Sequence, residues 1–138
     1  MKHKKIARSI WEFPQNALGF IVKTVCEATP YTIHNEATVY TWDIPGGMSL
    51  GRYIFVPFKR IKPTEFHAAQ MIRHEYGHTI QSKYFGWFYL LVIGLPSLLW
   101  AWCFDSYRTR TGKSYYSFYT EKWADKLGGV ERSEYEQR

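Results

Sequence analysis

Residues 64–86 read TEFHAAQMIRHEYGHTIQSKYFG and predict a long helix on which the rest of the fold depends. Thr64 is a suitable N-cap, because its hydroxyl can accept a hydrogen bond from a free backbone N–H. Glu65 suits the first turn, where the helix dipole favours negative charge. Glycine is common just after the C-terminus of a helix, so Gly86 predicts that the helix runs to about Tyr84.

The pentapeptide HEYGH occupies residues 74–78 of this helix. His74 and His78 are four residues apart, so both rings project from the same face. Two neutral imidazoles placed in this way can share one Zn²⁺ at about 2.0–2.1 Å. Glu75 lies beside such a metal and can take a proton from a zinc-activated water, then deliver it to a leaving group. Gly77 lets another element approach the helix closely at the metal.

A second acidic motif, EKWAD over 121–125, offers the ligand that two histidines lack. Glu121 and Asp125 lie on one face of a predicted helix. Glu121 can complete a His₂Glu site with a fourth position left for water, as in catalytic zinc sites. Asp125 can hold a ligand imidazole by its other nitrogen. Alone, these carboxylates would favour a solvated helix face; together with HEYGH, they predict a site for one Zn²⁺.

The two motifs together resemble those of the gluzincin zinc metallopeptidases, and the chain length resembles that of the smallest members, the minigluzincins. The resemblance implies that His74, His78 and Glu121 bind zinc. It implies that Glu75 is the general base and that Asp125 supports a ligand histidine. It also implies a strand before the helix, whose edge binds an extended peptide.

Two features depart from the family pattern. His78 and Glu121 are separated by 42 residues, more than in the minimal members. Gluzincins also often carry a Tyr or His that stabilises the oxyanion, and no motif identifies it here. Tyr115, Tyr116 and Tyr119 are candidates by position, and each is also explained as a structural residue.

The remaining sequence predicts a single α+β domain over 1–138 that is mainly helical. A small hairpin or sheet packs on the active-site helix, an apolar helical hairpin occupies 85–104, and a C-terminal helix carries the acidic ligand. The expected elements are a helix at 15–27, strands at 37–43 and 48–56, a loop-like segment at 105–118, a helix at 118–127 and a frayed tail at 130–138. The strand at 48–56 stands where the resemblance places the peptide-binding edge.

Residues 85–104 contain no charged residue and have the length of a membrane span. The ends of this stretch carry Trp87, Trp100 and Trp102, as in the aromatic belt of a protein at a membrane interface. The zinc hypothesis excludes one full crossing, since it would place the histidines and Glu121 about 30 Å apart. We therefore expect a hairpin that turns near Gly94–Pro96. It is buried in the core, dips into a membrane interface or packs on another chain.

The formal net charge is +6, and much of the excess lies at the amino end. This basic start fits either a solvated tail or contact with anionic lipid, and no nucleic-acid-binding motif accompanies it. Cys26 and Cys103 lie in apolar surroundings and are expected to be buried free thiols, which fits a reducing compartment. No uninterrupted apolar segment follows the basic start, so a signal peptide is not expected. The predicted location is cytoplasmic or membrane-associated.

These patterns favour a zinc-dependent metallopeptidase that hydrolyses peptide bonds of a peptide or protein substrate. One alternative is a non-catalytic, zinc-containing, membrane-associated binding protein, in which Glu75 would have no task. Another is that the motif is accidental, which predicts that Glu121 lies far from His74. The sequence does not indicate the cleavage specificity or the oligomeric state.

Overall fold

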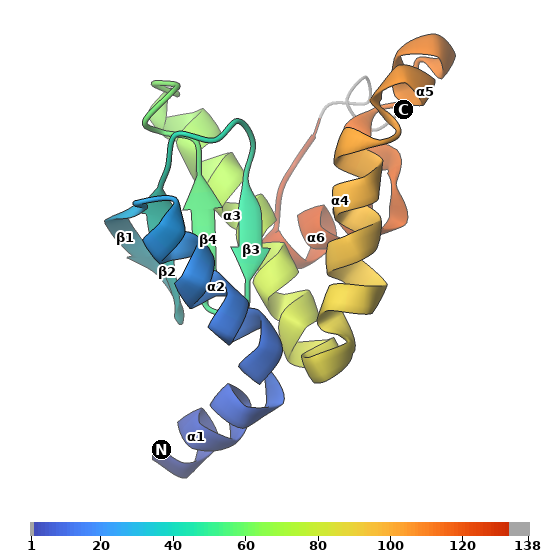
Figure 1. The fold of residues 1–138 in the computed structure, drawn as a ribbon. Coiled ribbons are helices and arrows are strands. Elements are labelled where there is room, and N and C mark those ends of the chain that lie inside the picture. The colour runs from blue at the N-terminus through green and yellow to red at the C-terminus, as the bar shows by residue number, and fades with distance from the viewer. Residues whose placement is uncertain (1, 133–138) are drawn as a thin grey trace.

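The structure, a computed structural model, describes residues 2–132, and within them the chain forms an α+β fold that is mainly helical, as predicted (Figure 1). The helices are α1 (Lys2–Trp11), α2 (Phe13–Val25), α3 (Glu65–Phe85), α4 (Leu95–Trp102), α5 (Asp105–Thr111) and α6 (Tyr119–Gly128). Three short helical turns are η1 (Gly86–Phe88), η2 (Leu90–Gly94) and η3 (Tyr115–Ser117). The strands are β1 (Thr29–His34), β2 (Ala37–Thr41), β3 (Met48–Leu50) and β4 (Tyr53–Val56).

The four strands form one mixed sheet in the order β1-β2-β4-β3. β2 and β4 are parallel, and the other two pairs are antiparallel. The predicted strand at 37–43 is confirmed as β2. The prediction of a single strand over 48–56 is wrong, because the chain turns at Gly51, whose φ of 63° lies in the left-handed region. β3 and β4 therefore form a hairpin, and β3 becomes an edge strand.

The sheet lies between α2 on one face and α3 on the other (Figure 1). Successive side chains of a strand point to opposite faces, and β4 follows this rule. Ile54 and Val56 pack toward α3 in a cluster with Ile72, whereas Phe55 joins Trp42 in the cluster on the α2 side. This arrangement fixes α3, which carries the histidines, directly against the sheet.

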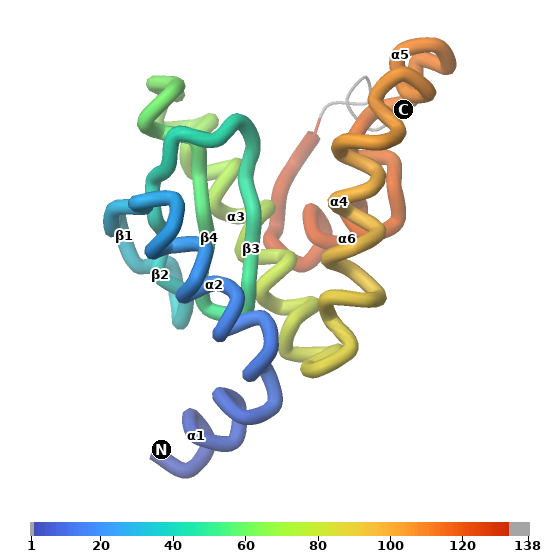
Figure 2. The backbone as a smooth tube through the Cα atoms, in the orientation of Figure 1, coloured from blue at the N-terminus to red at the C-terminus, as the bar shows by residue number. Residues whose placement is uncertain are grey.

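The apolar stretch reverses at a different place from the one predicted. α3 ends before Gly86, whose φ is 51°, and the chain then rises through η2, which contacts α3, and α4, which contacts α6 (Figure 2). The predicted turn at Gly94–Pro96 is wrong, since Gly94 and Leu95 are helical. η2 is a π-turn in which the Leu95 N–H bonds to the Leu90 carbonyl, and Pro96 occupies the first turn of α4, where a missing N–H is tolerated.

Of the remaining predictions, some are confirmed and others are wrong. The long helix and the last helix are confirmed as α3 and α6, but residues 105–118 contain α5 and η3 instead of only a loop. Cys26 and Cys103 are both free; Cys26 is half-buried and Cys103 exposed, so their predicted burial is wrong. Most of the predicted frayed tail, from residue 133 onward, lies outside the described residues.

Among residues 2–132, no single helix combines the length and apolarity needed to cross a membrane. The helical segment Leu90–Trp102 meets that criterion only together with α5, across a bend of 65°.

Candidate metal centre

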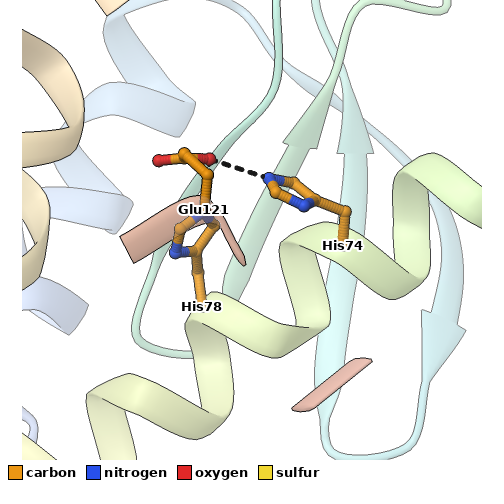
Figure 3. Close-up of side chains that lie close together, drawn as sticks. All are labelled: His74, His78 and Glu121. Atoms are coloured by element: carbon orange, nitrogen blue, oxygen red, sulfur yellow. Dashed lines mark hydrogen bonds and ion pairs between the residues drawn. The ribbon is translucent and has the colours of Figure 1, made fainter. Parts of the chain in front are cut away.

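The three predicted ligands converge between α3 and α6 (Figure 3). Glu121 Oε2 lies 3.0 Å from His74 Nε2 and 3.2 Å from His78 Nε2. All three residues are buried, and one candidate ligand atom from each lies within 4.8 Å of the other two. The group can therefore hold a metal ion, and the hypothesis that Glu121 lies far from His74 is wrong.

The close crossing of α3 and α6 depends on glycine. A Cβ on Gly77 would overlap the carbonyl oxygen of Ala124, and a Cβ on Gly128 would overlap that of Arg73. Each helix thus presents a glycine where the backbone of the other passes, which confirms the role predicted for Gly77. Without this approach, Glu121 would not reach the imidazoles.

The two Nδ1 atoms are occupied by hydrogen bonds that orient the rings. His74 Nδ1 lies 2.6 Å from Asp125 Oδ1, as predicted for Asp125, and His78 Nδ1 lies 2.7 Å from Gln81 Oε1. The Gln81 amide donates to the Thr120 carbonyl at 2.9 Å, so its own oxygen faces His78. When both Nδ1 atoms donate, both Nε2 lone pairs are left for a metal. Gln81 was missed, although its position three residues after His78 is a usable signal.

Arg132 is a second residue that the sequence did not indicate. Its Nε lies 2.6 Å from Asp125 Oδ2 and its Nη2 lies 3.0 Å from Asp125 Oδ1. The guanidinium lies 3.2 Å from the centre of the Tyr116 ring, and that ring meets His74 edge-on with centroids 5.4 Å apart. Arg132 and Tyr116 therefore hold the Asp125–His74 pair in place.

The buried cluster of His74, His78 and Glu121 favours the presence of positive charge. Burial by itself lowers the pKa of His74, but the hydrogen bonds that its ring donates to Asp125 and Glu121 outweigh burial and raise that pKa to about 10. Burial tends to raise the pKa of Glu121, but the two histidines hold it well below its usual range. The fold thus stabilises a carboxylate beside two imidazoles that need either protons or a cation, and a metal would replace the protons.

Glu75 is buried next to the ligands and is held by β3. Ser49 Oγ lies 2.8 Å from Glu75 Oε2 and 2.7 Å from the Glu75 carbonyl oxygen. A Cβ on Gly47 would overlap the Glu75 carboxylate, so the loop before β3 passes directly over it. Burial raises the pKa of the Glu75 carboxyl, and the nearby His74 only partly opposes this. The Tyr89 hydroxyl donates to the Ser49 carbonyl at 3.0 Å and covers this part of the sheet edge.

The three tyrosine candidates take different positions. Tyr115 is largely buried and bonds to the Glu121 side chain, and burial followed by the charge of Glu121 raises its pKa. Tyr116 lies against His74, as described above. Tyr119 donates its hydroxyl to the Val92 carbonyl at 2.8 Å, which supports a structural role. The structure therefore brings Tyr115 and Tyr116 to the candidate centre.

No protein family model, curated protein or solved structure matches this chain.

Proposed function

We propose that the chain is a zinc-dependent peptidase and that His74, His78 and Glu121 hold its metal. The observation that carries this proposal is the buried convergence of two Nε2 atoms and one carboxylate, with the acidic Glu75 immediately beside them. The gluzincin resemblance of the two motifs supports the same function.

Zinc is the metal that we propose for this donor set. Catalytic zinc sites commonly use three protein ligands of the His and Glu type and leave a fourth position for water. Zinc bound there would polarise the scissile carbonyl and lower the pKa of water enough for attack at neutral pH.

The side chains of the protein would supply the remaining chemistry. Glu75 is placed to accept a proton and return it to the departing amine, and its raised pKa suits a group that must do both. Asp125 and Gln81 orient the ligand rings. Tyr115 and Tyr116 are placed to donate a hydrogen bond to negative charge that develops on the substrate.

The edge strand β3 is the proposed peptide-binding element, as the family resemblance implies. It contains only three residues, and Tyr89 already bonds to the Ser49 carbonyl. Pairing with an extended peptide would therefore involve the loop that precedes Met48 as well as the strand.

The main rival is a zinc protein without catalytic activity. In such a protein Glu75 would be a buried acid with no task, and burying an ionisable group is unfavourable unless it is paired. The hydrogen bond from Ser49 to Glu75 fits a carboxylate that is held in position for use.

Metal analysis tests the ligand assignment. We expect one zinc per chain by mass spectrometry after purification in zinc-containing buffer, and a large loss of zinc in Glu121→Gln. Glu65→Gln is the matched control, because it changes an exposed glutamate on α3 and should retain zinc. A wild-type protein without metal would refute the ligand assignment.

Peptide cleavage tests the catalytic assignment. Wild type should cleave members of a broad peptide library, and Glu75→Gln should keep its zinc but lose cleavage. A zinc-loaded wild type that cleaves no peptide would favour the non-catalytic rival, and an active Glu75→Gln would exclude Glu75 as the base.

A further inference from the structure

The outer side of α2 is apolar, whereas its inner side includes buried polar groups beside Val22, which packs on the sheet. Its exposed apolar side chains have 38–75% of their surface accessible and are Phe13, Leu18, Phe20, Ile21 and Val25. Facing inward, Gln15 donates to Ser82 Oγ and to the Gly86 carbonyl, each at 2.9 Å. Glu12 is fully buried and accepts from Ser82 Oγ at 2.6 Å. A helix that faces water shows the opposite pattern.

The apolar stretch that follows α3 also exposes many apolar side chains to solvent. Residues 85–104 contain no charge, and only a few of their large side chains, such as Ile93 and Trp100, are buried. Those that remain 37–69% exposed include Trp87, Phe88, Leu91, Leu95, Leu98 and Trp102. Water-exposed apolar side chains are ordinary when scattered, but here they follow one another along a helical segment.

The two surfaces meet where α1 joins α2. Trp87 donates through Nε1 to the Ile10 carbonyl at 2.8 Å, and its ring centroid lies 6.4 Å from that of Phe13. In Figure 1, α2 lies in front of the sheet and α4 in front of α6, so both outer sides are on the near side of the molecule. We call the outward side chains of α2, η1, η2 and α4 the apolar face.

Positive charge flanks the apolar face at both ends. Residues 2–25 contain five Lys or Arg, and their only acidic residue, Glu12, is fully buried. α1 also exposes Ile6 and Ile10, one turn apart, beside these basic residues. Beyond α4, residues 103–118 contain Arg108, Arg110 and Lys113 against one acidic residue, Asp105, which pairs with Arg108. A basic amphipathic helix next to exposed aliphatic and Trp side chains has the chemistry of an anionic membrane surface.

We propose that the apolar face docks on a lipid bilayer with anionic headgroups and lies within its interface. The aliphatic side chains enter the boundary of the acyl chains, Trp87 and Trp102 lie at headgroup level, and the basic residues of α1 contact the headgroups. This docking does not require the chain to cross the bilayer. η2 and α4 have five and eight residues, so together they reach about 20 Å, less than the roughly 30 Å of a bilayer core.

A second copy of the chain is a poorer occupant. A two-fold contact places the same patch of each protomer against the other. The basic ends would then approach basic ends, because the exposed Glu36 and Asp105 already pair with Arg8 and Arg108 of their own chain. An anionic lipid surface matches the apolar area and the charge together.

Vesicle flotation with the full chain tests the proposal. Wild type should float with vesicles of phosphatidylcholine and phosphatidylserine in a three-to-one ratio, bind phosphatidylcholine alone at least tenfold more weakly, and lose affinity as salt is added. The assay needs neither metal nor substrate, so its outcome is independent of the proposed peptidase activity. A wild type that binds neither kind of vesicle overturns the proposal.

Two pairs of variants separate the apolar and charged contributions. Leu91→Glu, in an exposed position on η2, should lower vesicle binding at least tenfold, whereas Phe66→Glu, equally exposed on α3, should not change it. The double change of Lys4 and Lys5 to Gln should weaken binding about thirty-fold, equivalent to about 2 kcal/mol. The same loss of charge at two exposed lysines of α6 should have little effect.

Circular dichroism confirms that each variant is folded, and sedimentation gives its oligomeric state. A wild-type dimer that Leu91→Glu converts to a monomer would overturn the lipid proposal and assign the apolar face to a second copy. Equal binding of wild type to neutral and anionic vesicles would overturn the role given to the basic residues.

Discussion

Replacing Gly77 by Ala tests whether α3 and α6 cross as closely as the site requires. In an unhindered helix, Ala is more stable than Gly by about 1 kcal/mol. At Gly77, however, the new Cβ would overlap the carbonyl oxygen of Ala124, which belongs to the backbone and cannot rotate away. Overpacking of this kind costs about 1–3 kcal/mol, and we expect it to exceed the gain in helix propensity. The free energy of unfolding should therefore fall, by up to about 2 kcal/mol.

Gly94→Ala is the matched control within the same chain. Gly94 is helical, and the nearest atom to a Cβ there is Leu90 Cδ2 at 3.5 Å, an ordinary contact. We expect this change to raise the free energy of unfolding by about 0.5–1 kcal/mol. The two substitutions share their chemistry and should have opposite signs.

Urea unfolding of the metal-free proteins measures both effects, and zinc titration measures the consequence for the site. Glu121 lies one turn before Ala124, so a shift of α6 should move its carboxylate away from the imidazoles and weaken zinc binding in Gly77→Ala but not in Gly94→Ala. If Gly77→Ala were as stable as Gly94→Ala and bound zinc normally, the close crossing and the ligand geometry built on it would be refuted.

Three further predictions concern the site itself. The pKa of His74 is raised from 6.5 to about 10 without metal, so its proton stabilises the fold below about pH 6.5 and this contribution is lost toward about pH 10. Urea unfolding in a chelator should therefore show lower stability at about pH 9 than at about pH 6; equal stability would contradict the pKa. Asp125→Asn should weaken zinc binding by about 10–100-fold, measured by competition with a chelating dye, and exposed Asp105→Asn should not. Gly47→Ala should keep zinc but lower peptide cleavage, because its Cβ displaces the Glu75 carboxylate from its hydrogen bond with Ser49; unchanged cleavage would show that this position of Glu75 is not needed.

The sequence predicted the candidate site better than it predicted the fold around it. His74, His78, Glu121 and Asp125 were identified because helix periodicity relates residues four apart in a way that requires no tertiary information. Gln81 follows the same periodicity and could have been included.

The features that the sequence analysis missed depend on tertiary contacts or on local backbone conformations, and sequence patterns specify both only weakly. Gly51 breaks the predicted strand over 48–56, since a glycine in a strand pattern is compatible with continuation or with a turn. Pro96 predicted a reversal, but a preceding π-turn places it where a helix tolerates proline. Arg132 reaches Asp125 from seven residues away, beyond the end of α6, where no periodic rule applies.

The position of the ligands along the chain gives a metal ion a mechanical role. Because His78 and Glu121 bracket 42 residues, a metal held by both closes that part of the chain into a ring. Closing a ring removes conformational freedom chiefly from the unfolded chain, so the ion acts as a removable cross-link. The ring includes η1, η2 and α4, and hence a large share of the exposed apolar side chains. Chelation would thus also release a constraint on this apolar segment, which contacts α3 and α6, and freed apolar segments favour aggregation.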